Sequence, residues 1–291
     1  MPTHMIHSGR PSAEADGLKR EEVDRYFRAT ASYWRDIYHT QSLLPVIYRD
    51  RQRAALDWVE ALKLPAGARV LEVGCGAGLM TTALAQRGYL VDAIDCTPEM
   101  LEMTRRAAEA AGAGARVAVS LGDAHGLRFS SDRFALVVAL GVIPWLHSPA
   151  VALAEMARVL QPGGHLIATA DNRARLNRLL DPLSTPLLAP LRMAAKHLLR
   201  VAGWRKRRAG ELNPKMHYPR QLDRMVAAAG LRKMAGRTVG FGPFTLLSHT
   251  VLPAAAGLTL HRRLQALAGR GVPFLRSTGC HYLLLAQKPA L

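Results

Sequence analysis

The amino-acid sequence predicts a doubly wound α/β fold built on a mostly parallel sheet of seven strands. Two observations support this prediction. Between residues 65 and 170 short apolar runs alternate with helical patterns, and one more helix and two apolar runs follow residue 218. Alternating strands and helices favour a parallel sheet with helices on both faces. The 291 residues, 49% of them apolar, also suffice for a buried core.

The N-terminal part precedes this pattern. Residues 1–20 are rich in Pro, Ser, Gly, Ala and charged residues without an apolar period, which predicts a flexible tail. From residue 21 to residue 64 apolar residues recur at helical spacing up to Pro65, so we expect two or three helices. Five aromatic residues stand between Tyr26 and Tyr38, and they mark one of these helices as unusually aromatic.

Residues 65–170 hold the first part of the core. Strands are predicted at 68–74, 89–95, 115–123, 134–141 and 165–171, and helices at 80–88, 98–112 and 149–164. Residues 219–291 complete the core with a helix at 219–230, a strand at 231–239 and a last strand at 280–288. The apolar stretch 241–253 between the last two strands is expected either to wall a hydrophobic pocket or to form a helix packed on the core.

Residues 171–218 interrupt the alternation and are read as a basic amphipathic insertion. Residues 171–210 carry ten basic and two acidic residues, a large part of the formal net charge of +17. A helix starting at Pro190 would place leucines and alanines on one side and basic residues on another. Such a helix, ending in a tryptophan, is typical of an anionic membrane surface, and a cap packed on the core is the alternative. The residues of this surface are Arg192, Lys196, Arg200, Trp204, Arg205, Lys206, Arg207 and Arg208.

A glycine-rich turn follows the first predicted strand. Gly74, Gly76 and Gly78 stand at alternate positions, and Glu72 lies two residues before the first of them. Such a turn lets a ligand approach the backbone, but the spacing differs from the GxGxxG of a dinucleotide site. Seventeen residues beyond Gly78, Asp95 ends the second strand, where a carboxylate accepts both hydroxyls of a ribose. Together these residues indicate a nucleoside with a positively charged tail.

The motifs resemble the class I S-adenosylmethionine-dependent methyltransferases, in particular the branch of ubiquinone and menaquinone biosynthesis. Four segments match in order, and they span roughly residues 68–170. They are LEVGCGAG at 71–78, IDCTPEML at 94–101, GDAHGLRF at 122–129 and ARVLQPGGHLIAT at 157–169. The resemblance implies a Rossmann-like methyltransferase fold, S-adenosyl-L-methionine as cofactor, and a lid above the cofactor formed by the helices of residues 21–64.

The resemblance also assigns roles to individual residues. It implies that the methionine moiety of the cofactor binds beside Glu72, Gly74, Cys75 and Gly76, and that the ribose binds to Asp95. It further implies an adenosine wall of Cys96 and Met100, the adenine amino group near Asp123 and the backbone of Ala124, and the sulfonium near the backbone of Leu140. Cys75 and Cys96 are expected to be packed residues and not nucleophiles.

The sequence departs from the family pattern at two places. Phe134 and Ala135 stand where an aromatic–Asp pair is usual, and residues 143–145 stand where histidines are common. The second departure lies by the substrate, so no catalytic histidine is carried over from the family. A base for a phenol or acid acceptor must then come from other residues. We considered His39, His217, Tyr33 and His147, and selected His147 and Tyr33, the first because it lies past the carboxyl end of a strand.

We therefore expect an S-adenosylmethionine-dependent methyltransferase acting on a hydrophobic small molecule, such as a quinone precursor, isoprenoid, polyketide or lipid-like phenol, with oxygen favoured slightly over carbon. The alternative is methylation of RNA or another nucleic acid, which the charge invites. Against it, no Asn-Pro-Pro-aromatic motif and no Pro-Cys nucleophile follow the fourth strand. A catalytically inactive partner subunit ranks lower because the glycines and both acidic residues are intact. A nicotinamide oxidoreductase ranks lower because the glycine spacing differs from that of a dinucleotide site.

The remaining features narrow the setting. Three cysteines without a CxxC pair indicate neither a disulfide framework nor a structural metal site. The sequence shows no apolar run long enough for a membrane-spanning helix and no segment typical of a secretory signal. We therefore expect a cytoplasmic protein, attached to the membrane surface if the basic insertion binds lipid.

Overall fold

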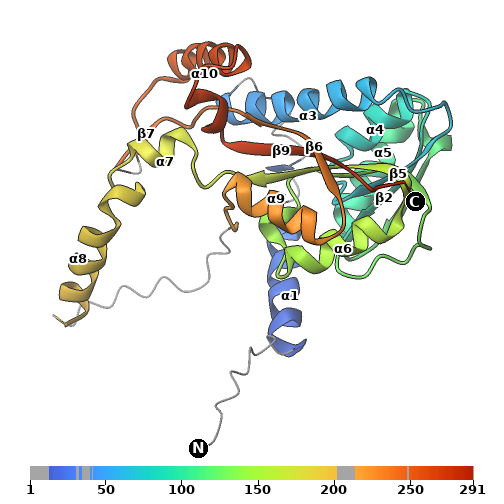
Figure 1. Ribbon diagram of the computed structural model, residues 1–291, viewed down its shortest axis with the longest axis horizontal. Coiled ribbons are helices and arrows are strands. Elements are labelled where there is room, and N and C mark those ends of the chain that lie inside the picture. Colours follow the sequence, from blue (N-terminus) through green and yellow to red (C-terminus); the bar gives the residue numbers. More distant parts are fainter. Residues whose placement is uncertain are drawn as a thin grey trace, which may run out of the picture.

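A computed structural model describes residues 13–30, 33–34, 40, 42–201, 214–247 and 249–290 (Figure 1). Its centre is a sheet of seven strands in the order β3-β2-β1-β4-β5-β9-β6. The strands are β1 (Arg69–Val73), β2 (Leu90–Asp95), β3 (Val117–Leu121), β4 (Phe134–Ala139), β5 (Leu160–Asp171), β6 (Arg232–Val239) and β9 (His281–Gln287). Only β9 runs antiparallel to its neighbours β5 and β6. The predicted doubly wound sheet and its seven strands are confirmed.

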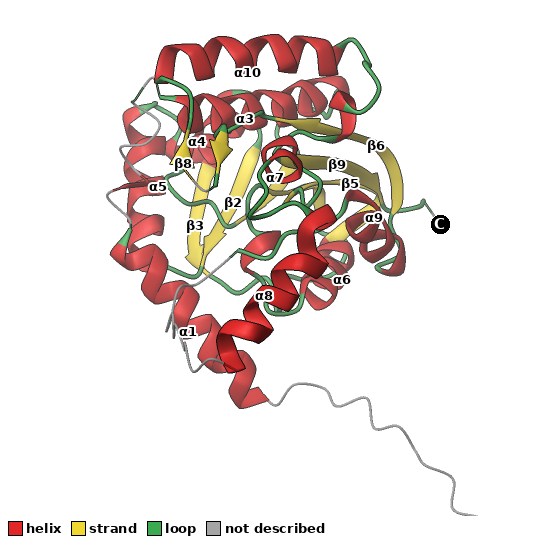
Figure 2. Cartoon of the chain, turned by 90° about the vertical axis from the view of Figure 1, so that its left-hand side faces the viewer, coloured by secondary structure: helices red, strands yellow, loops and turns green. Residues whose placement is uncertain are grey.

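Helices cover both faces of the sheet, as Figure 2 shows with α3 and α10 on one side and α6 and α9 on the other. The helices of the core are α3 (Leu43–Ala61), α4 (Leu79–Gln86), α5 (Pro98–Ala110), α6 (Pro149–Val159), α9 (Pro219–Ala228) and α10 (Ala254–Gly269). Each face has its own apolar core. Leu153, Met156 and Val226 pack from α6 and α9, and Val59 and Leu84 pack from α3 and α4. Burial on both faces explains why the strands read as continuous apolar runs.

The N-terminal region differs from the expectation at its start. Helix α1 (Ala13–Ala29) begins inside the segment that the composition assigned to a flexible tail, so residues 13–20 are helical. The polar and alanine-rich composition of this stretch suits an exposed helix as well as a coil, and the apolar period that reveals a packed helix is absent. Residues 1–12 lie outside the described part of the chain. Helices α1 and α3 confirm the predicted helical character of residues 21–64.

The segment after β6 also differs from both expectations. Residues 241–253 form no helix within the described part of this stretch. They include the short strands β7 (Thr245–Leu246) and β8 (His249–Thr250), and the chain then enters α10, for which the sequence interpretation assigned no helix. Phe241 is fully buried. Its backbone N–H donates to Nδ1 of the buried His261, whose Nε2 lies 2.9 Å from Oδ2 of Asp50. These contacts join the stretch to α10 and α3, and its described residues do not line the cavity at the carboxyl ends of the strands.

The basic insertion contains α7 (Leu176–Leu180), the 3₁₀ turn η4 (Pro186–Leu188) and α8 (Ala189–Val201). Helix α8 starts one residue before the predicted position and projects away from the sheet (Figure 1). Near the end of the insertion, the backbone N–H of Lys215 donates to the Pro144 carbonyl, and its Nζ donates to the carbonyls of Leu146 and His147. The insertion is thus fastened to the loop that follows β4.

Candidate active site

A cavity of about 460 Å³ lies at the carboxyl ends of the parallel strands. Ligands of open α/β sheets bind at this edge, where the strand order reverses between β1 and β4. The structure gathers all the residues selected from the sequence around this one cavity. They are Glu72, Gly74, Cys75, Gly76, Asp95, Cys96, Met100, Asp123, Ala124 and Leu140 on the cofactor side, with Tyr33 and His147 as candidate catalytic residues.

The glycine loop after β1 adopts a conformation that requires glycine. Gly74, Gly76 and Gly78 have φ angles of +71°, +54° and +82°, a region that costs other residues about 1–2 kcal/mol each. The backbone N–H groups of Gly74 and Cys75 both donate to the Ile94 carbonyl of β2, at 2.8 and 3.0 Å. A Cβ on Gly78 would lie 2.7 Å from Cα of Thr104 in α5, so this glycine also permits close helix packing.

Asp95 connects this loop to the end of β2. Its Oδ2 accepts the backbone N–H of Gly76 at 3.0 Å, and its Oδ1 accepts that of Thr97 at 3.1 Å. Burial raises the pKa of Asp95, while these backbone hydrogen bonds lower it. An ionised carboxylate has about four lone-pair sites, so two bonds leave capacity for the two hydroxyls of a ribose.

Glu72 is buried at the end of β1 with 3% of its surface exposed. The hydroxyl of Thr81 donates to its Oε2. Burial raises the pKa of Glu72 to about 8, with the Thr81 hydrogen bond opposing the shift and the charge of Asp95 adding to it. No lysine or arginine in the described ranges pairs with Glu72. A cationic group of a ligand would supply the missing counter-charge.

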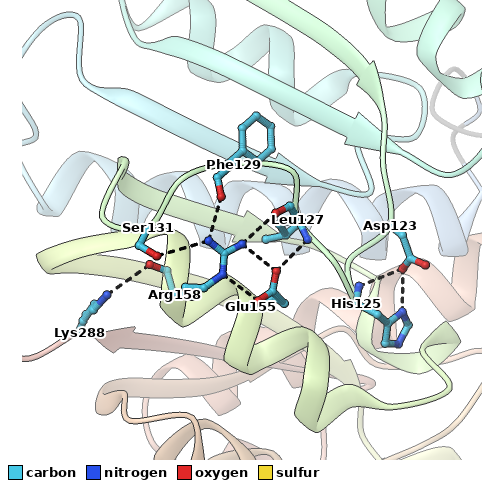
Figure 3. Close-up of polar contacts among 8 residues, drawn as sticks. All are labelled: Asp123, His125, Leu127, Phe129, Ser131, Glu155, Arg158 and Lys288. Carbon is cyan, nitrogen blue, oxygen red and sulfur yellow. Dashed lines mark hydrogen bonds and ion pairs between the residues drawn. The ribbon is translucent and has the colours of Figure 1, made fainter.

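A rigid support holds the loop that carries Asp123. Figure 3 shows Arg158 of α6 at the centre of this support, where its guanidinium donates to the carbonyls of Leu127 and Phe129 at 2.8 Å each. Glu155 pairs with Arg158 at 2.8 Å and accepts the backbone N–H of Leu127 at 2.9 Å. The hydrogen bond from Arg158 lowers the pKa of Glu155, although burial opposes the shift. The loop is therefore fixed by charge-assisted hydrogen bonds.

His125 of the same loop lies against His147, which stands between η3 and α6. His125 Nδ1 lies 2.8 Å from Oδ1 of Asp123, and the backbone N–H of Ser148 donates to its Nε2 at 3.3 Å. These partners assign the proton of a neutral His125 to Nδ1. The ring of His147 stacks on that of His125 with centroids 3.6 Å apart. His147 thus lies next to the wall expected to face adenine.

Aromatic rings close the cavity on the side of α1. Trp145, in the 3₁₀ turn η3 (Ile143–Trp145), stacks on Tyr26 at 5.1 Å between centroids and meets Phe27 edge-on at 5.0 Å. Trp34 packs against Phe27 and Tyr48 at 6.0 and 5.7 Å. Where the family commonly has histidines, this chain therefore has a tryptophan that holds the N-terminal helix. Tyr33 is half-exposed beside Trp34.

Sequence reasoning missed several polar residues of the cavity, and three of them lie together. Arg51 comes from α3, Asp171 ends β5 and His281 begins β9. No local motif marks them, because each stands alone in its own element and the tertiary fold brings them together. Only Asp171 carried a usable signal, since it ends a parallel strand at the ligand edge.

Other sequence candidates fall elsewhere. His39 lies outside the described residues, and His217 does not line the cavity; burial and the charge of Lys215 lower the pKa of His217. Cys75 is buried, and burial followed by the charge of Asp95 raises the pKa of Cys96 to about 11. A thiol with so high a pKa is a poor nucleophile. Within the described ranges no group of three or more His, Cys, Asp or Glu residues could hold a metal ion.

Comparison with known proteins agrees with this geometry. A family model described as a methyltransferase domain matches residues 71–168. The ubiquinone biosynthesis O-methyltransferase of Xanthomonas axonopodis pv. citri is 32% identical over 162 residues, which are 55% of this chain and 65% of that protein. An uncharacterized methyltransferase of Mycobacterium tuberculosis is 39% identical over 113 residues, 38% of this chain and 42% of that protein. The matches thus span less than two thirds of these relatives.

Solved structures show the same fold over nearly the whole chain. The [4+2]-cyclase SpnF superimposes with a TM-score of 0.62 at 18% identity, covering 94% of this chain and 97% of that one. Magnesium protoporphyrin IX methyltransferase of Synechocystis PCC 6803, with bound S-adenosylhomocysteine, has a TM-score of 0.60 at 15% identity, covering 93% and 99%. The likeness to these structures concerns the fold alone.

Proposed function

We propose that the chain transfers the methyl group of S-adenosylmethionine to a hydrophobic small molecule, from the premise that residues 71–168 form a class I S-adenosylmethionine-dependent methyltransferase domain. One observation carries the proposal. The cavity holds a buried carboxylate at Glu72, a second at Asp95, and Arg51 as the only lysine or arginine among the described residues that line it. These charges complement a ligand that has an ammonium group, a ribose and a carboxylate.

The residues present fit this cofactor. Asp95 would receive the ribose hydroxyls, Glu72 would neutralise the ammonium group, and Arg51 would pair with the carboxylate. Arg51 lies close to the loop after β4. A Cβ on Gly141 of this loop would be only 2.9 Å from the Nη1 atom of Arg51. Asp123 would face the adenine, with Met100 on the adenosine wall. S-adenosylmethionine supplies an activated methyl group, so the protein mainly positions two reactants and excludes water.

The acceptor side supports a hydrophobic substrate, with oxygen slightly favoured over carbon. Tyr26, Phe27, Trp34, Tyr48 and Trp145 give this side of the cavity an aromatic lining. Quinone precursors, isoprenoids, polyketides and lipid-like phenols all match such a surface. His147 and Tyr33, which the sequence suggested as bases, both line the cavity. Methylation of nucleic acid rests on the charge of +17 alone.

Methyl transfer is tested with S-adenosylmethionine carrying a tritiated methyl group. The purified protein is incubated with a panel of alkylphenols, alkylcatechols and prenylated quinols, and radioactivity is counted in the organic extract. Label in the extract supports the proposal. If the protein binds S-adenosylhomocysteine but label appears only in added RNA, the nucleic-acid alternative replaces it.

Glu72 should release a proton when the cofactor binds. The ligand ammonium group stabilises the ionised carboxylate, so binding lowers the pKa of Glu72 from about 8. We expect calorimetric titrations with S-adenosylhomocysteine at pH 7, run in buffers of different ionisation enthalpy, to show release of part of a proton. Glu72→Gln should abolish that release. Equal proton release in the variant would contradict the assignment.

The same group predicts how stability depends on pH without ligand. The pKa of Glu72 is higher in the folded protein, about 8, than its ordinary value of 4.5, so the folded state binds more protons between these values. The free energy of unfolding should therefore fall as pH rises from about 4.5 through about 8. In Glu72→Gln this fall should be smaller, which urea unfolding at several pH values measures.

A membrane surface is proposed as the place where the hydrophobic acceptor is found. The described part of the insertion exposes Leu187, Leu191 and Met193 by 85%, 68% and 71%. Such a group of exposed apolar side chains suits shallow insertion. Arg192, however, donates to the carbonyls of Pro182 and Thr185 at 3.1 and 2.6 Å, so part of its guanidinium is used within the insertion. The side chains of Lys196 and Arg200, and residues 204–208 entirely, lie outside what the structure describes.

Vesicle sedimentation tests this surface. The protein should bind vesicles that contain anionic lipid, bind neutral vesicles poorly, and dissociate as salt screens the charges. Replacing Arg205, Lys206, Arg207 and Arg208 by Gln, or Leu187 and Leu191 by Ser, should release it without changing its affinity for S-adenosylhomocysteine. Binding without lipid preference would contradict the proposal. In the described part of the chain, no helix has the length and apolar character needed to cross a bilayer.

A further inference from the structure

Asp171 and His281 form a polar pair on the side of the cavity away from Asp95. They face each other across the antiparallel ladder of β5 and β9, so both stand at the carboxyl edge of the sheet. The pair lies beyond β4 in the strand order, whereas Asp95 ends β2 on the other side of β1. Gly141 N–H donates to Oγ1 of Thr169, two residues before Asp171, at 2.7 Å. The loop after β4 is thus fixed beside this pair.

His281 is buried, and one of its ring nitrogens has no hydrogen bond among the described residues. Only 8% of its surface is exposed, yet within the described ranges its Nδ1 meets no hydrogen-bond partner. Oδ1 of Asp171 is close, at 3.3 Å, but outside hydrogen-bond geometry. A buried nitrogen left without a hydrogen bond is costly and is found at sites with a special role, catalysis among them. His281 lines the cavity.

The charges around the pair fix its protonation. Burial, and then the charges of Arg51 in α3 and Arg175 in the turn before α7, lower the pKa of His281 well below its ordinary value. The imidazole is therefore neutral and offers both a donor and an acceptor. Burial raises the pKa of Asp171, and the same two arginines lower it. Tyr48 completes the surroundings, with its ring 5.7 Å from that of His281.

We propose that Asp171 and His281 bind the hydroxyl of a phenolic methyl acceptor, with the Asp171 carboxylate as the proton acceptor. The inference rests on the proposed function and narrows its substrate class from hydrophobic molecules in general to phenols. A phenol has an aromatic ring for Trp34 and Tyr48, which pack together at 5.7 Å. It also has an acidic hydroxyl for a carboxylate. A carbon acceptor without a hydroxyl would leave the pair without this complement.

The reaction balances with these groups. The phenolic oxygen forms a bond to the methyl carbon, the carbon–sulfur bond breaks, and its electron pair stays on sulfur. The phenolic proton passes to Asp171 and later to water. Asp171 is the catalytic residue of this step. His281 is a positioning residue that hydrogen-bonds the phenol or the carboxylate and remains neutral throughout.

His147 is less suited to this role. Its ring stacks on His125 at 3.6 Å, and His125 is tied to Asp123. These contacts place it by the wall assigned to adenine, and replacing it should affect cofactor affinity more than proton transfer. Tyr33 is half-exposed beside Trp34, at the edge of the site and not enclosed in it.

Binding is tested first, with 4-nitrocatechol as a probe whose ionisation is visible in its absorbance. It is titrated from acid to alkaline pH in the presence of S-adenosylhomocysteine. The negative Asp171 opposes a phenolate beside it, so Asp171→Asn should lower the pKa of the bound probe. Asp57→Asn, an exposed carboxylate paired with Arg237, should leave it unchanged. An unchanged probe pKa in Asp171→Asn overturns the proposal.

Rates then distinguish a base from a structural role. With 4-octylcatechol, whose hydroxyls are protonated at neutral pH, Asp171→Asn should lower kcat by about 10²- to 10⁴-fold. With 4-nitrocatechol, already largely ionised, the loss should be below about 10-fold. His281→Gln should raise KM for the catechol more than it lowers kcat. The proposal is overturned if kcat falls equally with both acceptors, or if Asp171→Asn binds S-adenosylhomocysteine more weakly. Asp171 would then serve to hold Arg51 in position.

The outcome also separates this inference from the proposed function. A wild-type protein that binds S-adenosylhomocysteine and methylates the prenylated quinols only at a ring carbon, and no phenolic oxygen of any acceptor, overturns the inference alone. A wild-type protein that does not bind S-adenosylhomocysteine overturns the proposed function. Asp171→Asn that fails to fold is replaced by Asp171→Ser, judged by the same ratio of the two acceptors.

Discussion

Gly78→Ala is expected to destabilise the protein by about 2–5 kcal/mol and to abolish cofactor binding. The left-handed φ of +82° costs alanine about 1–2 kcal/mol. The new Cβ would also lie 2.7 Å from the backbone Cα of Thr104, and overpacking of this kind costs about 1–3 kcal/mol. Because α5 or the glycine loop must shift to relieve the clash, the loop loses the conformation that the ligand contacts. Urea unfolding and calorimetry with S-adenosylhomocysteine measure the two effects.

Gly76→Ala is the matched control. Gly76 has a φ of +54°, but a Cβ at this position would meet no atom of the protein within 4 Å. The variant should therefore lose only the backbone contribution of about 1–2 kcal/mol. The difference between the two variants isolates the clash with α5. Equal stability of Gly76→Ala and Gly78→Ala would show that this packing is wrong.

Asp95→Ala should weaken binding of S-adenosylhomocysteine about 10- to 150-fold. This range corresponds to loss of charge-assisted hydrogen bonds to the ribose of about 1.5–3 kcal/mol. The variant also loses the bonds to the N–H groups of Gly76 and Thr97, so its unliganded stability must be measured alongside. Asp92→Ala, on the same strand and paired with Arg69 and Arg133, is the control. Unchanged affinity in Asp95→Ala would remove the ribose from this position.

Most of the fold could be predicted because its strands are buried on both faces. The runs at 134–139 and 282–286 are buried, and they appear in the sequence as unbroken apolar segments. Local patterns do not report exposed or peripheral structure in the same way. Helix α1 was therefore taken in part for a tail. Helix α10 was not predicted. The segment before it was expected to wall a pocket or to form a helix, but its Phe241 is bound to His261 of α10, which contacts Asp50 of α3.

The cofactor side of the site was predictable for a different reason. Glu72, Gly74 and Asp95 lie in contiguous motifs at strand ends, so their spacing alone brings them to one edge of the sheet. The acceptor side is assembled from single residues of distant elements. Arg51, Asp171 and His281 come from α3, β5 and β9, and only the antiparallel insertion of β9 places His281 opposite Asp171. Such a pairing has no local sequence signal.

A crystal structure of the protein with S-adenosylhomocysteine tests the central claim most directly. We expect the ligand in the cavity, with its ribose hydroxyls on Asp95, its ammonium group near Glu72, its carboxylate at Arg51, and its sulfur directed toward the space in front of Asp171. A ligand bound outside this cavity, or in it with the ribose away from Asp95, would contradict the account.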